Sequence, residues 1–233
     1  MTARRGETQV RVKRVRGGRV LQVDGTFASW YRPGQAHTGS VWDALAAPLA
    51  WLPPSRRRSV LILGLGGGSA ARVARAIAPD CCIVGVEASA EVIRVARRWF
   101  DLDLVDVEVV RADAHAFLRR TRRRYDYVID DIFVGDARTL QKPPWLPLPG
   151  LALASRCLRP GGLLVSNVLD ERAVVTRALH DLFPRTLRID VDEYDNRILI
   201  GGPRGLDARA LRAAVTSQPV LTRALQRFSI RRC

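Results

Sequence analysis

Between residues 59 and 182, the hydrophobic positions of the chain alternate between two periods. Short runs that are almost entirely apolar are typical of buried strands, and the segments between them repeat apolar residues every three or four positions, as amphipathic helices do. The expected strands are 59–63, 82–87, 105–110, 126–130 and 162–167, and the expected helices are 69–78, 89–99, 113–120, 148–158 and 171–182. Near-continuous apolar strands between helices indicate a sheet that is covered on both faces. We therefore predict an α/β fold with a doubly wound, mostly parallel sheet.

Both ends of the chain follow another rhythm. Residues 8–30 alternate apolar and polar side chains, with Gly17–Gly18 and Asp24–Gly25 between the runs, which predicts a small antiparallel hairpin or meander. Two further alternating runs flank Asp195–Asn196 and predict an antiparallel hairpin at the edge of the large sheet.

A short helix is expected between the first hairpin and the α/β region, because Thr38 or Ser40 can cap it and Pro53–Pro54 closes it. These elements divide the chain into three parts. We expect an N-terminal β-hairpin extension at 1–35, a nucleoside-binding α/β domain at 36–205 and an arginine-rich helical tail at 206–233.

Composition narrows the functional classes. No window approaches the roughly 20 apolar residues of a membrane span, and the charged N-terminus is not followed by the apolar stretch of a secretory signal. We therefore expect a cytoplasmic protein without membrane association. The four cysteines and three histidines lack the spacing of metal ligands, so no metal is expected.

The formal net charge of +15 leaves two interpretations open. A strongly basic chain is typical of nucleic-acid-binding proteins, but arginines dispersed over solvent-exposed faces give the same total. The clusters 56–58 and 122–124 fall in separate connecting segments, and no RNA-binding motif with interleaved aromatic residues is present. This dispersal favours a solvated surface, although it does not exclude nucleic acid as a partner.

A glycine-rich turn stands where the first buried strand gives way to a helix. Gly64, Gly66, Gly67 and Gly68 would let a ligand approach the backbone at a helix N-terminus, which presents free N–H groups. The position that a dinucleotide fingerprint fills with its last glycine is Ser69. The loop alone is therefore a weak indication of nucleotide binding.

Acidic residues at the ends of successive strands strengthen that indication. Glu87, followed by Ala88, closes the second strand, and Asp113, followed by Ala114, comes after the third. The carboxyl ends of parallel strands line one crevice, where ligands bind. There Glu87 is placed to accept hydrogen bonds from a ribose diol, and Asp113 to meet an adenine amino group. Individually, Glu87 could be an exposed strand end and Asp113 only a helix N-cap.

Taken together, these carboxylates favour a cationic nucleoside over NAD, because a pyrophosphate would lie poorly beside them. S-adenosylmethionine and its decarboxylated form are such nucleosides. In "YDYVIDDIFVGD", Asp131 ends the fourth strand, where it could orient an incoming amine and accept its proton. Asp130 should point to the opposite side, as the partner of an arginine.

Several segments resemble the polyamine aminopropyltransferases, the spermidine synthase-like family: "RVLQVDG", "HTGSVWDALAAPL", "VLILGLGGGSAARVA", "VEASAEVIRVARRWF", "VRADAHAFL", "YDYVIDDIFVGD", "LRPGGLLVSNV" and "DNRILIGGP". The glycine-rich and "VEAS" segments are shared with class I methyltransferases, which have a Rossmann-like fold. The resemblance implies that Gly64–Gly68, Glu87 and Asp113 hold decarboxylated S-adenosylmethionine. It also implies that Asp131 is the catalytic aspartate for transfer of an aminopropyl group to an amine, with release of methylthioadenosine, and that the protein is a possible homodimer.

The chain departs from the family pattern mostly on the acceptor side. Gly67 replaces a loop aspartate, Val41-Trp42-Asp43 replaces a Tyr-His-Glu triplet, and Asn167 replaces a glutamine. The candidate acceptor-binding residues are Trp30, Tyr31, Trp42, Asp43 and Asp136. Two alternatives stay open: a methyltransferase that uses S-adenosylmethionine, and a non-catalytic binding module on the same fold.

Overall fold

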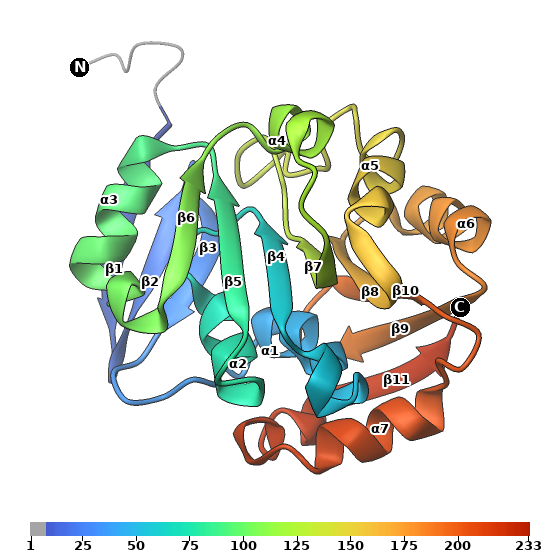
Figure 1. Ribbon diagram of the computed structural model, residues 1–233. Coiled ribbons are helices and arrows are strands. Elements are labelled where there is room, and N and C mark those ends of the chain that lie inside the picture. The colour runs from blue at the N-terminus through green and yellow to red at the C-terminus, as the bar shows by residue number, and fades with distance from the viewer. Residues whose placement is uncertain (1–7) are drawn as a thin grey trace.

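A computed structural model describes residues 8–233 (Figure 1). The strands of the large sheet are β4 (Ser59–Leu63), β5 (Cys82–Glu87), β6 (Val107–Arg111), β7 (Tyr125–Asp130), β8 (Leu158–Val168), β9 (Arg185–Val191), β10 (Arg197–Gly202) and β11 (Phe228–Arg232). The helices are α1 (Val41–Ala46), α2 (Ser69–Ile77), α3 (Ala90–Trp99), α4 (Ala114–Arg120), α5 (Gly150–Arg156), α6 (Arg172–Leu182) and α7 (Ala208–Thr216). A separate small sheet contains β1 (Val10–Val15), β2 (Gly18–Val23) and β3 (Thr26–Tyr31).

The predicted doubly wound α/β fold is confirmed. The strand order is β11-β9-β10-β8-β7-β4-β5-β6, with β4 to β8 parallel and β9, β10 and β11 antiparallel. From β4 the chain proceeds to β5 and β6 on one side, and then returns to β7 and β8 on the other. The strand order therefore reverses between β4 and β7, and open α/β sheets bind their ligands outside the carboxyl ends at such a point.

Alternate side chains of the central strands enter two separate cores. Val60 and Ile62 face the layer that contains α1, α2 and α7, whereas Leu61 and Leu63 face the layer that contains α4, α5 and α6. This alternation is the period of two that a pleated strand imposes. Both faces are apolar because both are covered, which explains the near-continuous hydrophobic runs of the sequence.

The predicted N-terminal meander packs on α3 and on the glycine loop. Leu21 of β2 is fully buried in a cluster with Val92 and Val95 of α3. The backbone N–H of Trp30 donates to Ser69 Oγ at 3.0 Å, which fixes β3 beside the start of α2. The small sheet is thereby held next to the carboxyl ends of the large one.

The C-terminal tail differs from the predicted helical segment. It begins with α7, but its last residues form β11, which pairs with β9 and becomes the outermost strand of the large sheet. The β9–β10 hairpin was expected at the edge and instead has β11 beyond it. Ile230 is buried in the main core, and this burial explains why the end of the tail is a strand. In the part of the chain described here, no helix combines the length and the apolar character needed to cross a bilayer.

The first prediction concerns the packing of α6 on β10. A Cβ atom at Gly201 would lie 2.3 Å from Phe183 Cδ2, so the ring would have to move. We expect Gly201→Ala to lower the free energy of unfolding by about 1–3 kcal/mol, as overpacking does. Gly205→Ala is the matched control, because no heavy atom lies within 4 Å of its added Cβ. Urea denaturation measures both variants, and equal stabilities would contradict this packing.

Candidate active site

A cavity of about 790 Å³ opens at the carboxyl ends of the central strands. Its walls come from the turn between β2 and β3, the start of α1, the ends of β4 to β8, the loop between β7 and α5, and the β9–β10 turn. The cavity therefore lies at the reversal of strand order. Of the residues assigned to a donor site from the sequence, the lining ones are Gly64, Gly66, Glu87, Ala88, Asp113, Ala114 and Asp131.

Gly64 allows the ends of β4 and β7 to approach each other. Its φ is +83°, and a Cβ atom there would lie 2.7 Å from the backbone oxygen of Asp131. Both the backbone angle and the contact require glycine. Asp131 is fixed from the same side, because its N–H donates to the carbonyl oxygen of Leu63 at 2.9 Å.

Glu87 connects the glycine loop to the end of β5. One carboxylate oxygen accepts from the N–H of Gly66 at 3.1 Å, and the other accepts from the N–H of Ser89 at 3.0 Å. Each oxygen has two lone pairs, so capacity remains for the hydroxyls of a ribose. The carboxylate is therefore positioned by backbone groups before any ligand arrives.

Gly67 and Gly68 do not line the cavity. The N–H of Gly67 donates to Ser29 Oγ at 2.6 Å, and a Cβ atom there would lie 3.1 Å from the ring of Phe100. At Gly68, a Cβ atom would lie 2.6 Å from Leu102. These two glycines make room for neighbouring packing, which the sequence pattern could not distinguish from ligand contact.

Asp113 is both a helix cap and a residue of the cavity wall. It caps α4, since Oδ1 accepts from the N–H of Ala116 at 2.8 Å, and it also lines the cavity. Nearby, the rings of His115 and Trp145 stack with their centroids 4.9 Å apart, and Trp145 is part of the cavity wall. A flat apolar surface and a carboxylate thus flank the same region, as an adenine would require.

Asp131 is held by two side-chain donors. Trp42 Nε1–H donates to one oxygen at 3.0 Å, and Asn167 Nδ2–H donates to the other at 2.7 Å. Asn196 in turn donates to the side-chain oxygen of Asn167 at 2.9 Å, which fixes the orientation of that amide. Burial raises the pKa of Asp131 to about 6, against the opposing effects of Asn167, Lys142 and Trp42. A carboxylate with this pKa is suited to accept a proton near neutral pH.

Asp130 points away from the cavity, as expected, but its partner is not an arginine. Its carboxylate accepts from Lys142 Nζ at 2.9 Å and from Ser166 Oγ at 2.7 Å, and both charged side chains are almost fully buried. An unpaired charge at such a site would be costly, so this pair binds the loop after β7 to the sheet. Lys142 lies 12 residues beyond Asp130, and no sequence pattern marks it as the partner.

Of the five candidate acceptor residues, Trp42 lines the cavity. Trp30 and Tyr31 do not: Trp30 packs at the edge of the main core, and the Tyr31 hydroxyl donates to Asp101. Both belong to β3, whose packing on α2 and α3 accounts for them. The aromatic residue of β3 that does reach the cavity is Phe27, whose ring contacts Trp42 edge to face with centroids 4.9 Å apart.

The two remaining candidates, Asp43 and Asp136, also lie outside the cavity lining. Asp43 is fully buried, and its oxygens accept from the N–H groups of Thr38 and Gly39 at 2.7 and 2.8 Å. It thus fixes the turn before α1, while Ser40 is the N-cap residue without a side-chain bond. Asp136 is exposed and accepts from Thr139 Oγ1 at 3.0 Å within its own turn.

The structure adds carboxylates that sequence reasoning did not assign to the site. Asp24, Glu193 and Asp195 line the cavity from the β2–β3 and β9–β10 turns, and Glu193 is paired with Arg227. The dipeptides Asp24–Gly25 and Asp195–Asn196 indicated only turns, because a hairpin signal does not tell which strand ends face each other. Asn167 was matched to a family position but was not assigned a contact with Asp131.

Comparison with known proteins gives two related groups. Residues 60–162 match the family profile described as "Methyltransferase domain". The chain is 29% identical over 178 residues to a probable polyamine aminopropyl transferase of Bifidobacterium longum, covering 72% of this chain and 38% of that protein. The chain is thus similar in sequence to a polyamine aminopropyltransferase over most of its length. It is also 27% identical to an eEF1A lysine and N-terminal methyltransferase of Xenopus laevis, covering 69% of this chain and 26% of that protein.

Solved structures with similar folds come from both groups. A probable spermidine synthase from Corynebacterium glutamicum superposes with a TM-score of 0.77 at 21% identity, covering 97% of this chain and 88% of that one. Human methyltransferase-like protein 13, in complex with SAH, superposes with a TM-score of 0.66 at 24% identity, covering 80% of this chain and 92% of that one. The chain spans well under half the length of these two curated relatives. Their whole activities therefore do not transfer directly.

The second prediction separates a structural Asp43 from an acceptor-binding one. Asp43→Ala leaves the Thr38 and Gly39 donors without their partner, so we expect a loss of about 1–3 kcal/mol in the free energy of unfolding. Asp136→Ala is the control: it removes an exposed carboxylate whose hydrogen bonds stay within its own surface turn, so we expect a smaller change. Chemical denaturation measures the free energy of unfolding. Calorimetry measures the affinity for an adenosyl donor and thereby shows whether the cavity is intact. A stable Asp43→Ala protein would contradict the structural role.

Proposed function

We propose that this chain is a transferase that moves an alkyl group from an adenosyl sulfonium donor to an amine, with Asp131 as the proton acceptor. The observation that carries the proposal is the placement of Asp131. It lies at the reversal of strand order, held by Trp42 and Asn167, in a cavity that also contains Glu87 and Asp113. A purely structural carboxylate would have no need to face a cavity of this size.

The part of the cavity around Glu87 and Asp113 has groups that suit an adenosyl group. Glu87 has free acceptor capacity for a ribose, and Asp113 together with the Trp145 ring suits an adenine. The sulfonium would then lie near Gly64 and Asp131, where a negative charge stabilises it. Support also comes from the SAH complex of methyltransferase-like protein 13, a structure with the same fold.

The part of the cavity around Asp131 suits an amine as acceptor. An amine attacks the carbon next to sulfur with its lone pair; the C–S bond breaks, its electron pair stays on sulfur as a neutral thioether, and the excess proton on nitrogen passes to Asp131. Alkyl amines are protonated at neutral pH, so a nearby carboxylate favours binding and deprotonation together. Asp24 and Asp195, which form no described ion pair, add negative charge to the cavity lining that suits an ammonium group, whereas Glu193 is paired with Arg227.

Decarboxylated S-adenosylmethionine is the donor that we propose first, because the sequence resembles the aminopropyltransferase family and two similar proteins are named polyamine aminopropyltransferases. Methyl transfer from S-adenosylmethionine is the second candidate. The glycine loop does not separate the two donors, because both carry a tail amino group and Gly67 is packed against Ser29 and Phe100 outside the cavity lining. The methyltransferase relative from Xenopus laevis gives the same alternative.

The third prediction tests the donor site at Asp113. We expect Asp113→Ser to weaken donor binding by about 1.5–3 kcal/mol, the value of a hydrogen bond to a charged group. Serine is itself a good N-cap, so the stability of α4 should be retained. Asp113→Ala loses both, and comparing the two variants separates capping from binding. Calorimetry with each donor measures the affinity, and an unchanged affinity in Asp113→Ser would remove Asp113 from the site.

The fourth prediction tests the chemistry at Asp131. We expect Asp131→Asn to bind the donor nearly as well as the parent protein while turnover falls about 10²-fold or more, as for a lost proton acceptor. In the parent protein the ionised form is active, so kcat/KM should fall as the pH drops through about 6. A bound sulfonium favours the carboxylate, and the midpoint of kcat should therefore lie at lower pH.

Product analysis with both donors and a panel of di- and polyamines decides between the two candidate reactions. Methylthioadenosine with an aminopropylated amine supports the first, and S-adenosylhomocysteine with a methylated acceptor supports the second. Donor binding without turnover on any amine, together with an unchanged Asp131→Asn variant, would contradict the proposed function and favour a binding module.

A further inference from the structure

Arginines gather at the amino ends of three neighbouring strands. Arg56–Arg58 precede β4, Arg122–Arg124 precede β7, and Arg156 and Arg159 flank the start of β8. Because β4, β7 and β8 are adjacent and parallel, their first residues lie side by side along the side of the sheet where the strands begin. The clusters that looked dispersed along the chain therefore meet in space. The arginines are dispersed along the sequence but not in space, so the argument for a merely solvated surface does not apply here.

Hydrogen bonds show that these segments touch. The Arg56 guanidinium donates to the carbonyl oxygen of Pro160 in β8. Asp126 of β7 accepts from the backbone N–H of Arg58 at 3.3 Å and from Arg159 Nη1 at 3.0 Å. Segments that are up to about a hundred residues apart in the sequence thus form one continuous surface.

Most of the arginine charge on this surface is unpaired. Within residues 8–233, six exposed arginines of this region form no ion pair: Arg58, Arg119, Arg120, Arg122, Arg124 and Arg156. We call these six residues the basic edge. The neighbouring carboxylates are already engaged, Asp126 by Arg159 and Glu108 by Arg123.

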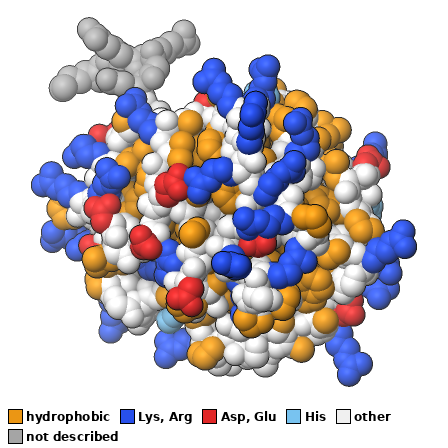
Figure 2. All heavy atoms as spheres, in the orientation of Figure 1, with side chains coloured by type: hydrophobic (Ala, Val, Ile, Leu, Met, Phe, Trp, Pro, Cys, Tyr) orange, Lys and Arg blue, Asp and Glu red, His pale blue; other side chains and the backbone are white. Residues whose placement is uncertain are grey.

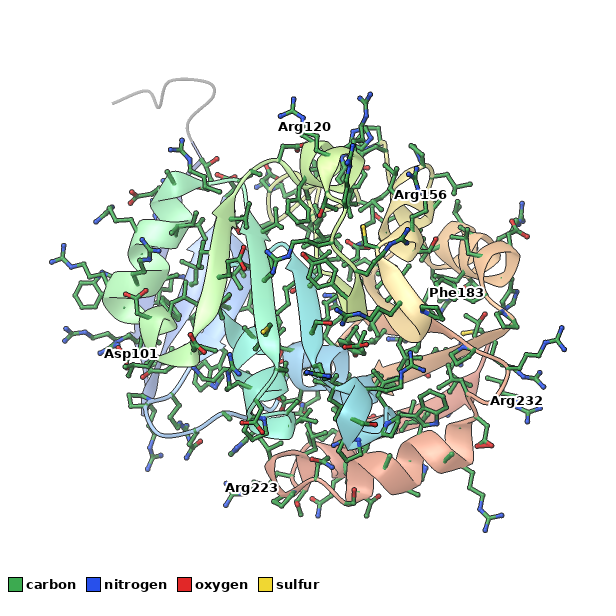
Figure 3. The ribbon with its side chains drawn as sticks, viewed as in Figure 1. Asp101, Arg120, Arg156, Phe183, Arg223 and Arg232 are labelled. Atoms are coloured by element: carbon green, nitrogen blue, oxygen red, sulfur yellow. The ribbon has the colours of Figure 1, made fainter. Side chains whose placement is uncertain are left out.

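The surface of the molecule shows the same grouping. In Figure 2, a band of Lys and Arg side chains runs from the top of the visible face to its centre, with few acidic side chains beside it. Figure 3 labels Arg120 and Arg156 in the upper part of the same view, near α4 and α5, whereas Arg223 lies at the bottom. Arg120 and Arg156 of the basic edge thus lie on the part of the visible face where that band begins.

We propose that the basic edge binds the phosphate backbone of a nucleic acid duplex without reading its sequence. Guanidinium groups present planar forks of donors that match phosphate oxygens, and they keep their charge at any physiological pH. The starts of three adjacent strands span about 10 Å, over which a duplex presents several phosphates. The edge thus offers a row of cations to a row of anions.

The exposed apolar side chains of the molecule lie elsewhere, which favours a duplex over a membrane or an unstacked single strand. The large hydrophobic residues that are exposed in the described chain are Val15, Phe27, Leu104, Val134, Leu148 and Val174. None of them belongs to the segments of the basic edge. A bilayer surface would take apolar side chains into its interface, and unpaired bases would stack on exposed aromatic rings.

The basic edge and the cavity are separate sites. The cavity opens at the carboxyl ends of the strands, and the basic edge lies at their amino ends, so the proposal goes beyond the proposed function and does not depend on it. Substitutions at the basic edge should leave donor binding unchanged, and this provides a check on folding that is independent of nucleic acid.

The fifth prediction compares two triple variants of equal charge. The first is Arg58→Ala/Arg122→Ala/Arg124→Ala at the basic edge. The control is Arg209→Ala/Arg212→Ala/Arg223→Ala, three exposed arginines of α7 and the segment after it that also form no described ion pair. Each variant loses three positive charges, which reduces the formal net charge from +15 to +12 (15 − 3).

Fluorescence anisotropy should be measured with labelled RNA and DNA duplexes of about 20 base pairs, in two unrelated sequences each, between about 50 and 200 mM salt. We expect the basic-edge variant to bind all duplexes at least about tenfold more weakly at the lowest salt, and the slope of log K against log salt to become shallower by about 2–3. The control should keep the slope of the parent protein. Calorimetry with the adenosyl donor should give equal affinities for all three proteins.

Three outcomes would overturn the proposal. The first is an equal loss of affinity in both triple variants, which would assign binding to the total charge. The second is no binding of the parent protein to any duplex at the lowest salt. The third is tighter binding to vesicles that contain phosphatidylglycerol than to any duplex, which would make the basic edge a membrane-binding surface.

Discussion

The contact between Gly64 and Asp131 is the constraint on which the site depends. Two adjacent parallel strands end here and their chains diverge, so the residues after β4 and β7 must pass within van der Waals distance before they separate. A Cβ at Gly64 would lie 2.7 Å from the Asp131 carbonyl oxygen, and the φ of +83° excludes most other residues independently. Any side chain at position 64 would push the ends of the strands apart. The Asp131 carboxylate, the glycine loop and the cavity are thus positioned by one backbone contact.

The surroundings of two buried carboxylates show why only one is suited to chemistry. Burial is the largest cause of a raised pKa at both Asp43 and Asp131. Asp43 is closed off, and its donors are the backbone of the preceding turn and the Thr38 hydroxyl, so its charge serves local structure. Asp131 faces the cavity, and its donors are side chains of Trp42 and Asn167 that leave lone pairs toward a ligand. The difference lies in the access to a substrate, because Asp43 is fully buried whereas Asp131 is partly exposed at the cavity.

The sequence predicted the features that local patterning determines. Strands 59–63 and 82–87 were predicted with their observed bounds, since covered parallel strands are apolar throughout, and Glu87, which ends the second of them, reaches the cavity. Predictions became wrong where tertiary contacts decide the direction of a side chain. The side chains of β3 point to alternate faces of the small sheet. Tyr31 therefore packs in the core beside Phe100, and Phe27 is the aromatic residue that lines the cavity. The pairing of Lys142 with Asp130, and the position of Asp24 and Asp195 in the cavity wall, depend on how loops fold back onto the sheet. The local pattern of hydrophobic residues does not encode this folding.

The same parallel topology gives the two edges of the sheet opposite charge. Acids lie after the carboxyl ends of the strands at the cavity, and arginines precede the amino ends at the basic edge. A strand of five residues is about 17 Å long, whereas charges at physiological salt are screened beyond roughly 8–10 Å. The fields at the two edges are therefore largely independent. A net charge of +15 repels a cationic amine at long range, but an amine that reaches the cavity meets Asp24, Asp131 and Asp195 at closer range than the basic edge. A basic protein can thus present an acidic site, because parallel strands hold the loops at their amino ends apart from the loops at their carboxyl ends.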